Sequence, residues 1–179
     1  MVNEPSGSTG PTRNEPGPGL GSEQAHFSAF LRFYRATVVA KARSMPDARL
    51  RRASPQWGWT PLELVQHLAF MERRWFTWGF LAEPVPDPWG DSQGSPDGSW
   101  QVPSHLTVDD VVRLLDEQAA TTERILSTRA MDEPAALGGR FDADPPDLRW
   151  ICFHVLQEYA RHAGHLDLAV EVAGGLTGE

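Results

Sequence analysis

The stretch WTPLELVQHLAFMERRWFTWGF, residues 59–80, carries a complete start signal for an amphipathic helix. Thr60 is a suitable N-cap, Pro61 suits the first helical position, and Glu63 completes a capping box with the threonine. The residues that follow recur at intervals of three and four. This spacing places one set on a single face: Leu64, His67, Leu68, Met71, Trp75 and Trp78. The stretch therefore predicts a helix whose buried face includes a histidine.

Three other segments show the same periodicity. One runs from Gln24 to about Met45, and a second begins at Thr107, with two aspartates in its first turn, and continues to about Thr128. The last runs from about Asp147 to Ala173 and ends at a glycine pair. Four long amphipathic helices predict an all-α protein folded as a four-helix bundle. The long connection at 82–105 leaves the order of helix directions open.

Composition limits the classes of function. The chain has 179 residues, with 24 acidic residues against 16 Lys and Arg and a formal net charge of -8. An acidic chain without a basic run lacks the footprint that binds nucleic acid or an anionic membrane surface. No apolar run is long enough to span a bilayer, and no signal peptide is visible. Cys152 is the only cysteine, which excludes an internal disulfide and fits a reducing cytoplasm.

Two regions lie outside the predicted helices: the N-terminal segment and the long connection between the second and third helices. Residues 1–20 are rich in Pro, Gly, Ser and Asn and have few apolar side chains, so we expect a disordered tail before a bundle domain at 21–179. The connection 82–105 is long for a compact domain and suggests a lid or a binding role. Its aspartates, Asp87, Asp91 and Asp97, do not follow a calcium-loop pattern and are expected to be solvated turn residues.

The segment HVLQEYARHAGHLDLAV, residues 154–170, gathers groups that can bind a metal on one side of the last helix. At about 100° per residue, His162 lies roughly 40° from Glu158, His165 about 20° to its other side, and His154 about 40° away. Two imidazoles and one carboxylate suit zinc or another divalent transition metal and leave a position open for water or substrate. The favoured ligand set is His67, Glu158 and His162.

Each of these residues also has an ordinary structural interpretation. A single histidine on an apolar face is commonly a hydrogen-bonded core residue, and an i, i+4 pair such as Glu158 and His162 can simply stabilise a helix. The combination on two inward faces favours a metal site. His165 remains a neighbouring partner, an alternative ligand or a proton relay, whereas His154 is expected to pack or to form a hydrogen bond.

Two motifs resemble a known family. WTPLELVQHLAFMERRWF (59–76) and RWICFHVLQEYARHAGHLDLA (149–169) are similar to the DinB-like metalloproteins, in the actinobacterial branch of mycothiol S-transferases and mycothiol-dependent maleylpyruvate isomerase. The resemblance extends over residues 24–174. It implies an up-down-down-up bundle with metal ligands at His67, Glu158 and His162. Relatives often have a glutamine where this chain has His165.

The resemblance also implies a chemistry. Mycothiol, a low-molecular-weight thiol, would bind a divalent metal, with Zn²⁺ the expected ion, and attack an electrophilic small molecule in a detoxification reaction. A cation lowers the pKa of a thiol, so no protein cysteine is needed and Cys152 is expected to be an inert buried residue. A non-catalytic small-molecule binding or resistance protein and a metal-dependent hydrolase remain alternatives.

The tryptophans fall into two groups. Trp75, Trp78 and Trp150 have helical spacing and are expected in the core or at the face of a homodimer. Trp89 and Trp100 belong to the long connection, where each would cover a substrate pocket or anchor the loop.

Overall fold

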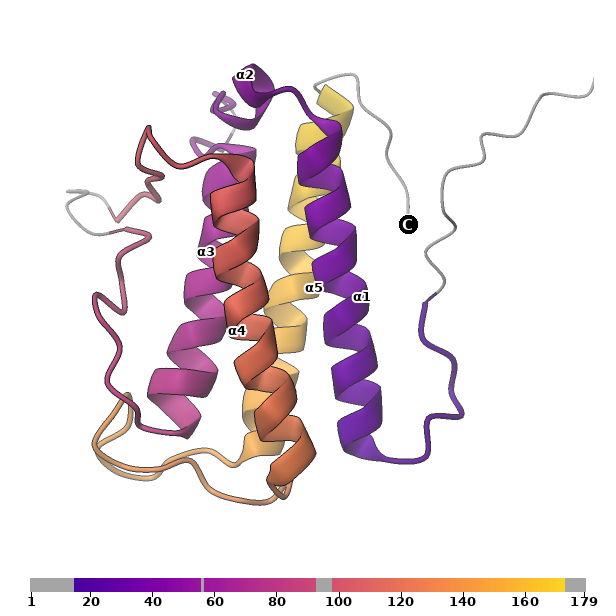
Figure 1. Ribbon diagram of the computed structural model, residues 1–179, viewed down its shortest axis with the longest axis vertical. Coiled ribbons are helices and arrows are strands. Elements are labelled where there is room, and N and C mark those ends of the chain that lie inside the picture. The colour runs from indigo at the N-terminus through magenta and orange to yellow at the C-terminus, as the bar shows by residue number, and fades with distance from the viewer. Residues whose placement is uncertain (1–14, 56, 93–97, 173–179) are drawn as a thin grey trace, which may run out of the picture.

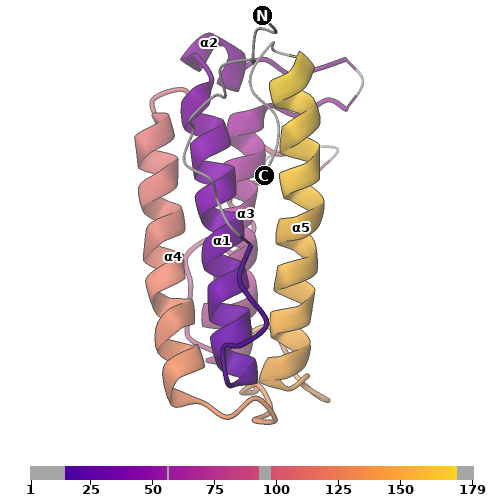
Figure 2. The same ribbon diagram turned by 90° about the vertical axis from the view of Figure 1, so that its right-hand side faces the viewer.

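The computed structural model describes residues 15–55, 57–92 and 98–172 of the chain. These residues form four long helices, α1 (Glu23–Ser44), α3 (Pro61–Trp75), α4 (Val108–Thr128) and α5 (Leu148–Val172), and contain no β-strand. α3 packs mainly against α4, and α1 packs mainly against α5 (Figures 1 and 2). The predicted all-α bundle is therefore confirmed.

The helix directions follow from two connections at the ends of the bundle and a longer one along its side. In Figure 1, α1 runs upward, α3 and α4 both run downward, and α5 runs upward. The long connection after α3 returns along the outside of the bundle to the start of α4. This return brings the loop alongside α3.

The helix starts are fixed by side-chain caps that the sequence indicates. The Thr60 hydroxyl accepts from the Glu63 backbone N–H at 3.2 Å, and the Glu63 carboxylate accepts from the Thr60 N–H at 2.7 Å. Thr107 and Asp110 form a second capping box at the start of α4. These caps satisfy N–H groups that have no partner inside the helix.

Two local features were not predicted. The segment after α1, where the sequence indicates only a stop, forms the single-turn helix α2 (Asp47–Leu50). α3 ends in a wide π-type turn, η1 (Phe76–Phe80), in which the Leu81 N–H donates to the Phe76 carbonyl at 3.0 Å. Its free carbonyls at Trp78 and Phe80 accept from the backbone of the connection between α4 and α5.

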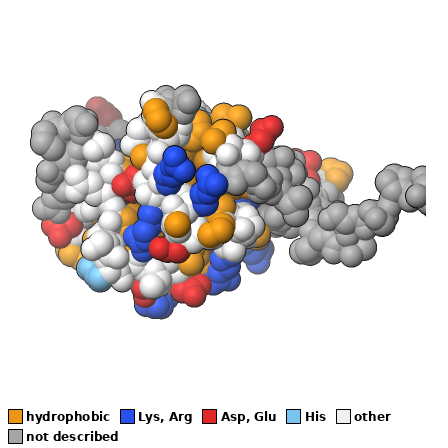
Figure 3. Space-filling model, turned by 90° about the horizontal axis from the view of Figure 1, so that it is seen from above, with side chains coloured by type: hydrophobic (Ala, Val, Ile, Leu, Met, Phe, Trp, Pro, Cys, Tyr) orange, Lys and Arg blue, Asp and Glu red, His pale blue; other side chains and the backbone are white. Residues whose placement is uncertain are grey.

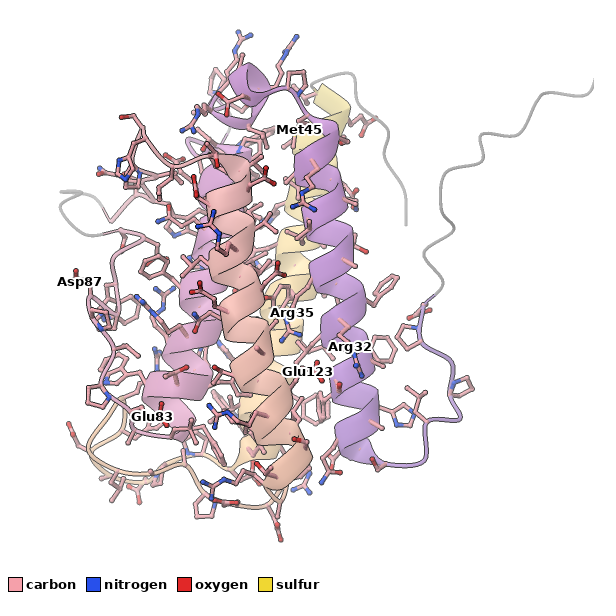
Figure 4. The ribbon with its side chains drawn as sticks, in the orientation of Figure 1. Arg32, Arg35, Met45, Glu83, Asp87 and Glu123 are labelled. Carbon is pink, nitrogen blue, oxygen red and sulfur yellow. The ribbon has the colours of Figure 1, made fainter. Side chains whose placement is uncertain are left out.

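A polar network crosses the core and joins all four long helices. Glu72 of α3 is fully buried and accepts hydrogen bonds from Arg35 of α1, Thr122 of α4 and Tyr159 of α5. Arg35 also lies 3.5 Å from Glu123 of α4, and Figure 4 shows both side chains between the two helices. A buried charge is costly unless it is paired, so this network favours one arrangement of the four helices.

The remaining expectations about the fold concern the surface and the ends. Trp75 lies in the core, whereas Trp150 is 51% exposed, and a homodimer through such residues stays a prediction. None of the described helices is both long and apolar enough to cross a membrane. Most of the predicted disordered tail, residues 1–14, lies outside the described residues.

Candidate metal centre

The structure brings together the three side chains favoured from the sequence. His67 comes from α3, and Glu158 and His162 stand one turn apart on α5. One potential ligand atom from each lies within 4.8 Å of the other two. Glu158 Oε2 is 3.1 Å from His162 Nε2, and the rings of His67 and His162 are 5.1 Å apart at 71°. Two nitrogen donors and one oxygen donor therefore converge on one point between the helices.

His67 is held by a carboxylate from the long connection. Asp91 Oδ2 lies 2.8 Å from His67 Nδ1, which leaves His67 Nε2 free as the donor on the other side of the ring. A carboxylate behind an imidazole fixes the ring orientation and raises the basicity of the distal nitrogen. Asp91 thus orients His67 toward Glu158 and His162.

The expectation that Asp91 is a solvated turn residue is wrong. Only 1% of Asp91 is exposed, and Arg74 donates to both of its carboxylate oxygens at 2.6 and 3.1 Å. Burial alone would raise the pKa of Asp91, but the hydrogen bonds from His67 and Arg74 and the charge of Arg74 lower it below its usual value. Asp91 is therefore an anion at neutral pH. Asp87 is exposed, as expected, and Asp97 lies outside the described residues.

The loop that carries Asp91 is fastened to α3 by consecutive arginines. Arg73 donates to the carbonyls of Pro86 and Asp87, both at 3.0 Å, and Arg74 donates to the carbonyl of Pro88 at 3.1 Å. Gly90 lies so close to α3 that an added Cβ would stand 2.8 Å from the ring of Phe70. These contacts give Asp91 a fixed position.

The two loop tryptophans have different surroundings. Trp100 stacks on His67, with ring centroids 4.0 Å apart and an angle of 18°, and its ring lies 5.5 Å from that of His162. Trp89 is 51% exposed and lies against the guanidinium groups of Arg74 and Arg140. Trp100 is therefore part of the candidate centre, whereas Trp89 anchors the loop.

The protonation of His162 suits a metal ligand. His162 is 7% exposed, and burial together with the neighbouring His67 lowers its pKa to about 4. Its imidazole is therefore neutral at pH 7, the form in which histidine donates a lone pair to a metal. Two imidazoles with one carboxylate form a donor set that fits a divalent transition metal.

Comparison with known families shows the family of the chain. Residues 26–175 match the model of the family described as mycothiol-S-transferase. The chain belongs to the mycothiol S-transferase family. It is thereby a member of the DinB-like superfamily, as the two sequence motifs predicted. No curated protein matches the chain.

His165 and His154 flank the three candidate ligands in this member of the mycothiol S-transferase family. His165 Nδ1 lies 3.4 Å from His162 Nδ1, on the side of that ring away from Glu158, so it is placed as a neighbouring partner of His162. His154 Nε2 is 3.7 Å from Glu158 Oε1, and its ring packs against both Trp75 and Trp150. His154 therefore packs, as expected.

Cys152 is unsuited to act as a nucleophile. It is fully buried, and this burial raises the pKa of its thiol to about 12. At neutral pH the side chain is therefore a protonated thiol, whereas the thiolate is the reactive form. Any nucleophilic sulfur in a reaction of this protein must then come from a substrate.

Sequence reasoning missed Asp91 and Arg74, although one signal was present. Arg74 stands seven residues after His67 and therefore shares its helix face. An arginine on an inward face requires a buried carboxylate partner. The sequence could indicate that such a partner exists, but nothing in the loop pattern singles out Asp91 from the other two aspartates.

Proposed function

We propose that this chain is a metal-dependent mycothiol S-transferase in which His67, Glu158 and His162 hold one divalent cation. Membership of the mycothiol S-transferase family indicates the thiol and the class of reaction. The convergence of three donor atoms within 4.8 Å is the observation that carries the metal dependence. Zinc fits two nitrogens and one oxygen best.

Three side chains of the protein would surround the cation on one side. Glu158 would contribute a carboxylate oxygen, and His67 and His162 would contribute imidazole nitrogens. The side chain of Glu158 is 22% exposed, so the centre is open to solvent on one side. A bound divalent cation would lower the pKa of the mycothiol thiol, so that the thiolate nucleophile forms at neutral pH.

The transfer needs no reactant other than the thiol and the electrophile. The thiol loses its proton to solvent, its sulfur forms a bond to the electrophilic carbon, and the leaving group departs with the electron pair. With an epoxide, the C–O bond breaks and the oxygen takes up a proton. The protein residues position the partners: Asp91 and Trp100 hold His67 in place, and the loop that carries them borders the centre.

His165 is proposed to orient His162 and not to bind the cation. Its Nδ1 faces the His162 nitrogen that is turned away from Glu158. A hydrogen bond there would fix the ring as Asp91 fixes His67. A cytoplasmic location, where thiols stay reduced, is part of the same proposal.

The proposal is tested by incubating the metal-loaded protein with mycothiol and a panel of haloarenes and epoxides, with conjugates detected by mass spectrometry. We expect conjugation well above that of the metal-free protein. The His162→Ala variant should lose both metal and activity, whereas His105→Ala, which changes an exposed histidine outside the centre, should retain both.

Three outcomes would contradict the proposal. Equal rates with and without metal would remove the metal dependence. Substrate loss without any thiol would favour a hydrolase that uses metal-activated water. Binding of the small molecules without conjugation, across the whole panel, would favour a non-catalytic binding protein.

A further inference from the structure

An open cavity of about 300 Å³ lies beside the candidate metal centre. Its lining comes from the segment before α3 and from the last part of the long loop: Trp57, Gly58, Trp59, Gly98, Ser99 and Trp100. Both segments lie toward the end of the bundle at which α2 lies and α3 begins. Figure 3 views that end and shows exposed hydrophobic side chains among Lys and Arg side chains.

Two walls of the cavity are in contact with the centre. Trp100 stacks on His67 with ring centroids 4.0 Å apart. The ring of Trp59 lies 6.0 Å from that of His165, the neighbour of His162. A small molecule in the cavity would therefore be separated from His67 and His162 by single aromatic rings.

The chemistry of the lining indicates what would bind. Three indole rings, with Trp57 and Trp59 stacked at 5.3 Å and 29°, present aromatic faces, and none of the described lining residues is charged. An uncharged aromatic wall disfavours a charged group, which would lose its hydration without a partner. Aromatic rings gain from each other beyond simple burial. The volume suits a group of one or two rings.

We propose that this cavity is the acceptor subsite and that it binds an uncharged planar aromatic group of the electrophile. That the bound group belongs to the electrophile rests on the proposed transferase function. The binding of an aromatic group can be measured without any reaction.

Binding is tested first with an unreactive pair that shares one carbon skeleton. Equilibrium dialysis of the metal-loaded protein against 2-naphthol and its saturated counterpart decahydro-2-naphthol compares an aromatic with an aliphatic ring system. We expect 2-naphthol to bind about 2- to 12-fold more tightly, the factor that one aromatic pair supplies. Trp57→Leu should remove most of this preference, and Trp150→Leu, which changes a half-exposed tryptophan outside the lining, should keep it.

The second arm uses transfer. With mycothiol present, Trp57→Leu and Trp59→Leu should raise the KM for styrene oxide several-fold, with little change in the KM for cyclohexyl oxirane or for mycothiol. Metal content and thermal midpoint, measured on each variant, confirm that the centre and the fold are intact.

The two proposals fail in different ways. Equal binding of both naphthol compounds, or a preference that survives Trp57→Leu, would overturn the aromatic subsite. A rise in the KM for mycothiol alone would also overturn it, because the cavity would then hold the thiol. Selective 2-naphthol binding without conjugation of any electrophile would instead contradict the transferase function and leave the aromatic site standing.

Discussion

The substitution Asp91→Asn tests how far the long loop controls the metal centre. The asparagine has nearly the same shape but no charge, and Asp91 is the group behind the Nδ1 of His67 at 2.8 Å. In the carboxylate, Oδ2 accepts from both His67 and Arg74, and Oδ1 accepts from Arg74. The amide has only one oxygen, and its NH2 group would face one of these donors in place of the second oxygen. We therefore expect His67 to be held less firmly and to be a weaker donor.

The expected size follows from these contacts. Loss of a carboxylate behind a ligand histidine lowers metal affinity about 10- to 100-fold, or roughly 1.4 to 2.7 kcal/mol. The fold is also weakened, because Arg74 is buried and loses its charged partner, which costs about 1.5 to 3 kcal/mol for a charged hydrogen bond. The remaining contact of Arg74 with the Pro88 carbonyl and its position over the Trp89 ring limit that loss.

Metal affinity is measured by competition with a chromophoric chelator, and unfolding by circular dichroism in urea. The matched control is Asp87→Asn in the same loop. Asp87 is exposed, Figure 4 shows it on the loop away from the bundle, and its backbone rather than its side chain contacts Arg73. Asp87→Asn should leave both quantities unchanged. A folded Asp91→Asn protein with the metal affinity of the parent would refute the idea that the loop carboxylate orients His67.

Three more predictions concern the rest of the chain. Glu72→Gln should cost about 3 to 5 kcal/mol in urea unfolding, because it removes the fully buried carboxylate that pairs with Arg35 and leaves that cation only its 3.5 Å contact with Glu123. Glu123→Gln, at a partly exposed site, keeps the pair with Glu72 and should cost about 1 kcal/mol or less; equal losses would contradict the role of the buried network. The raised pKa of Cys152 keeps its thiol protonated in the folded protein. At pH 8 the native protein should therefore react with a disulfide reagent about 100-fold or more slowly than the urea-unfolded protein. Rapid reaction of the native protein would show an accessible thiolate. Deletion of residues 1–20 should leave the thermal midpoint nearly unchanged, since that segment has few apolar side chains; a large drop would mean that it packs on the bundle.

The helices were predictable because their signals are local. The capping box of Thr60 and Glu63 and the repeat of apolar residues at three and four determine where α3 begins and which face it buries. The same repeat places Glu158 and His162 on one side of α5. Once both faces had to turn inward, the approach of His67 to that pair followed from geometry. The turn α2 was missed because four residues are too few to show a period.

The contacts made by loops and by buried charges were not predictable in the same way. Asp91 lies 24 positions after His67, in a connection without periodicity, and only the folded loop distinguishes it from Asp87. Glu72 sits on α3, but its partners come from three other helices, so their identity depends on how the helices are rotated. Periodicity finds the inward faces, and tertiary packing decides which polar groups meet there.

The most direct test of the central claim is X-ray absorption spectroscopy at the zinc edge of the zinc-loaded protein, before and after addition of mycothiol. The account predicts a first shell of nitrogen and oxygen donors with two imidazoles, joined by one sulfur at about 2.3 Å when mycothiol is added. The sulfur should appear equally in Cys152→Ser and be absent, with the zinc, from His162→Ala. A shell that gains no sulfur, or that contains sulfur before the thiol is added, would contradict the proposal that this centre activates mycothiol.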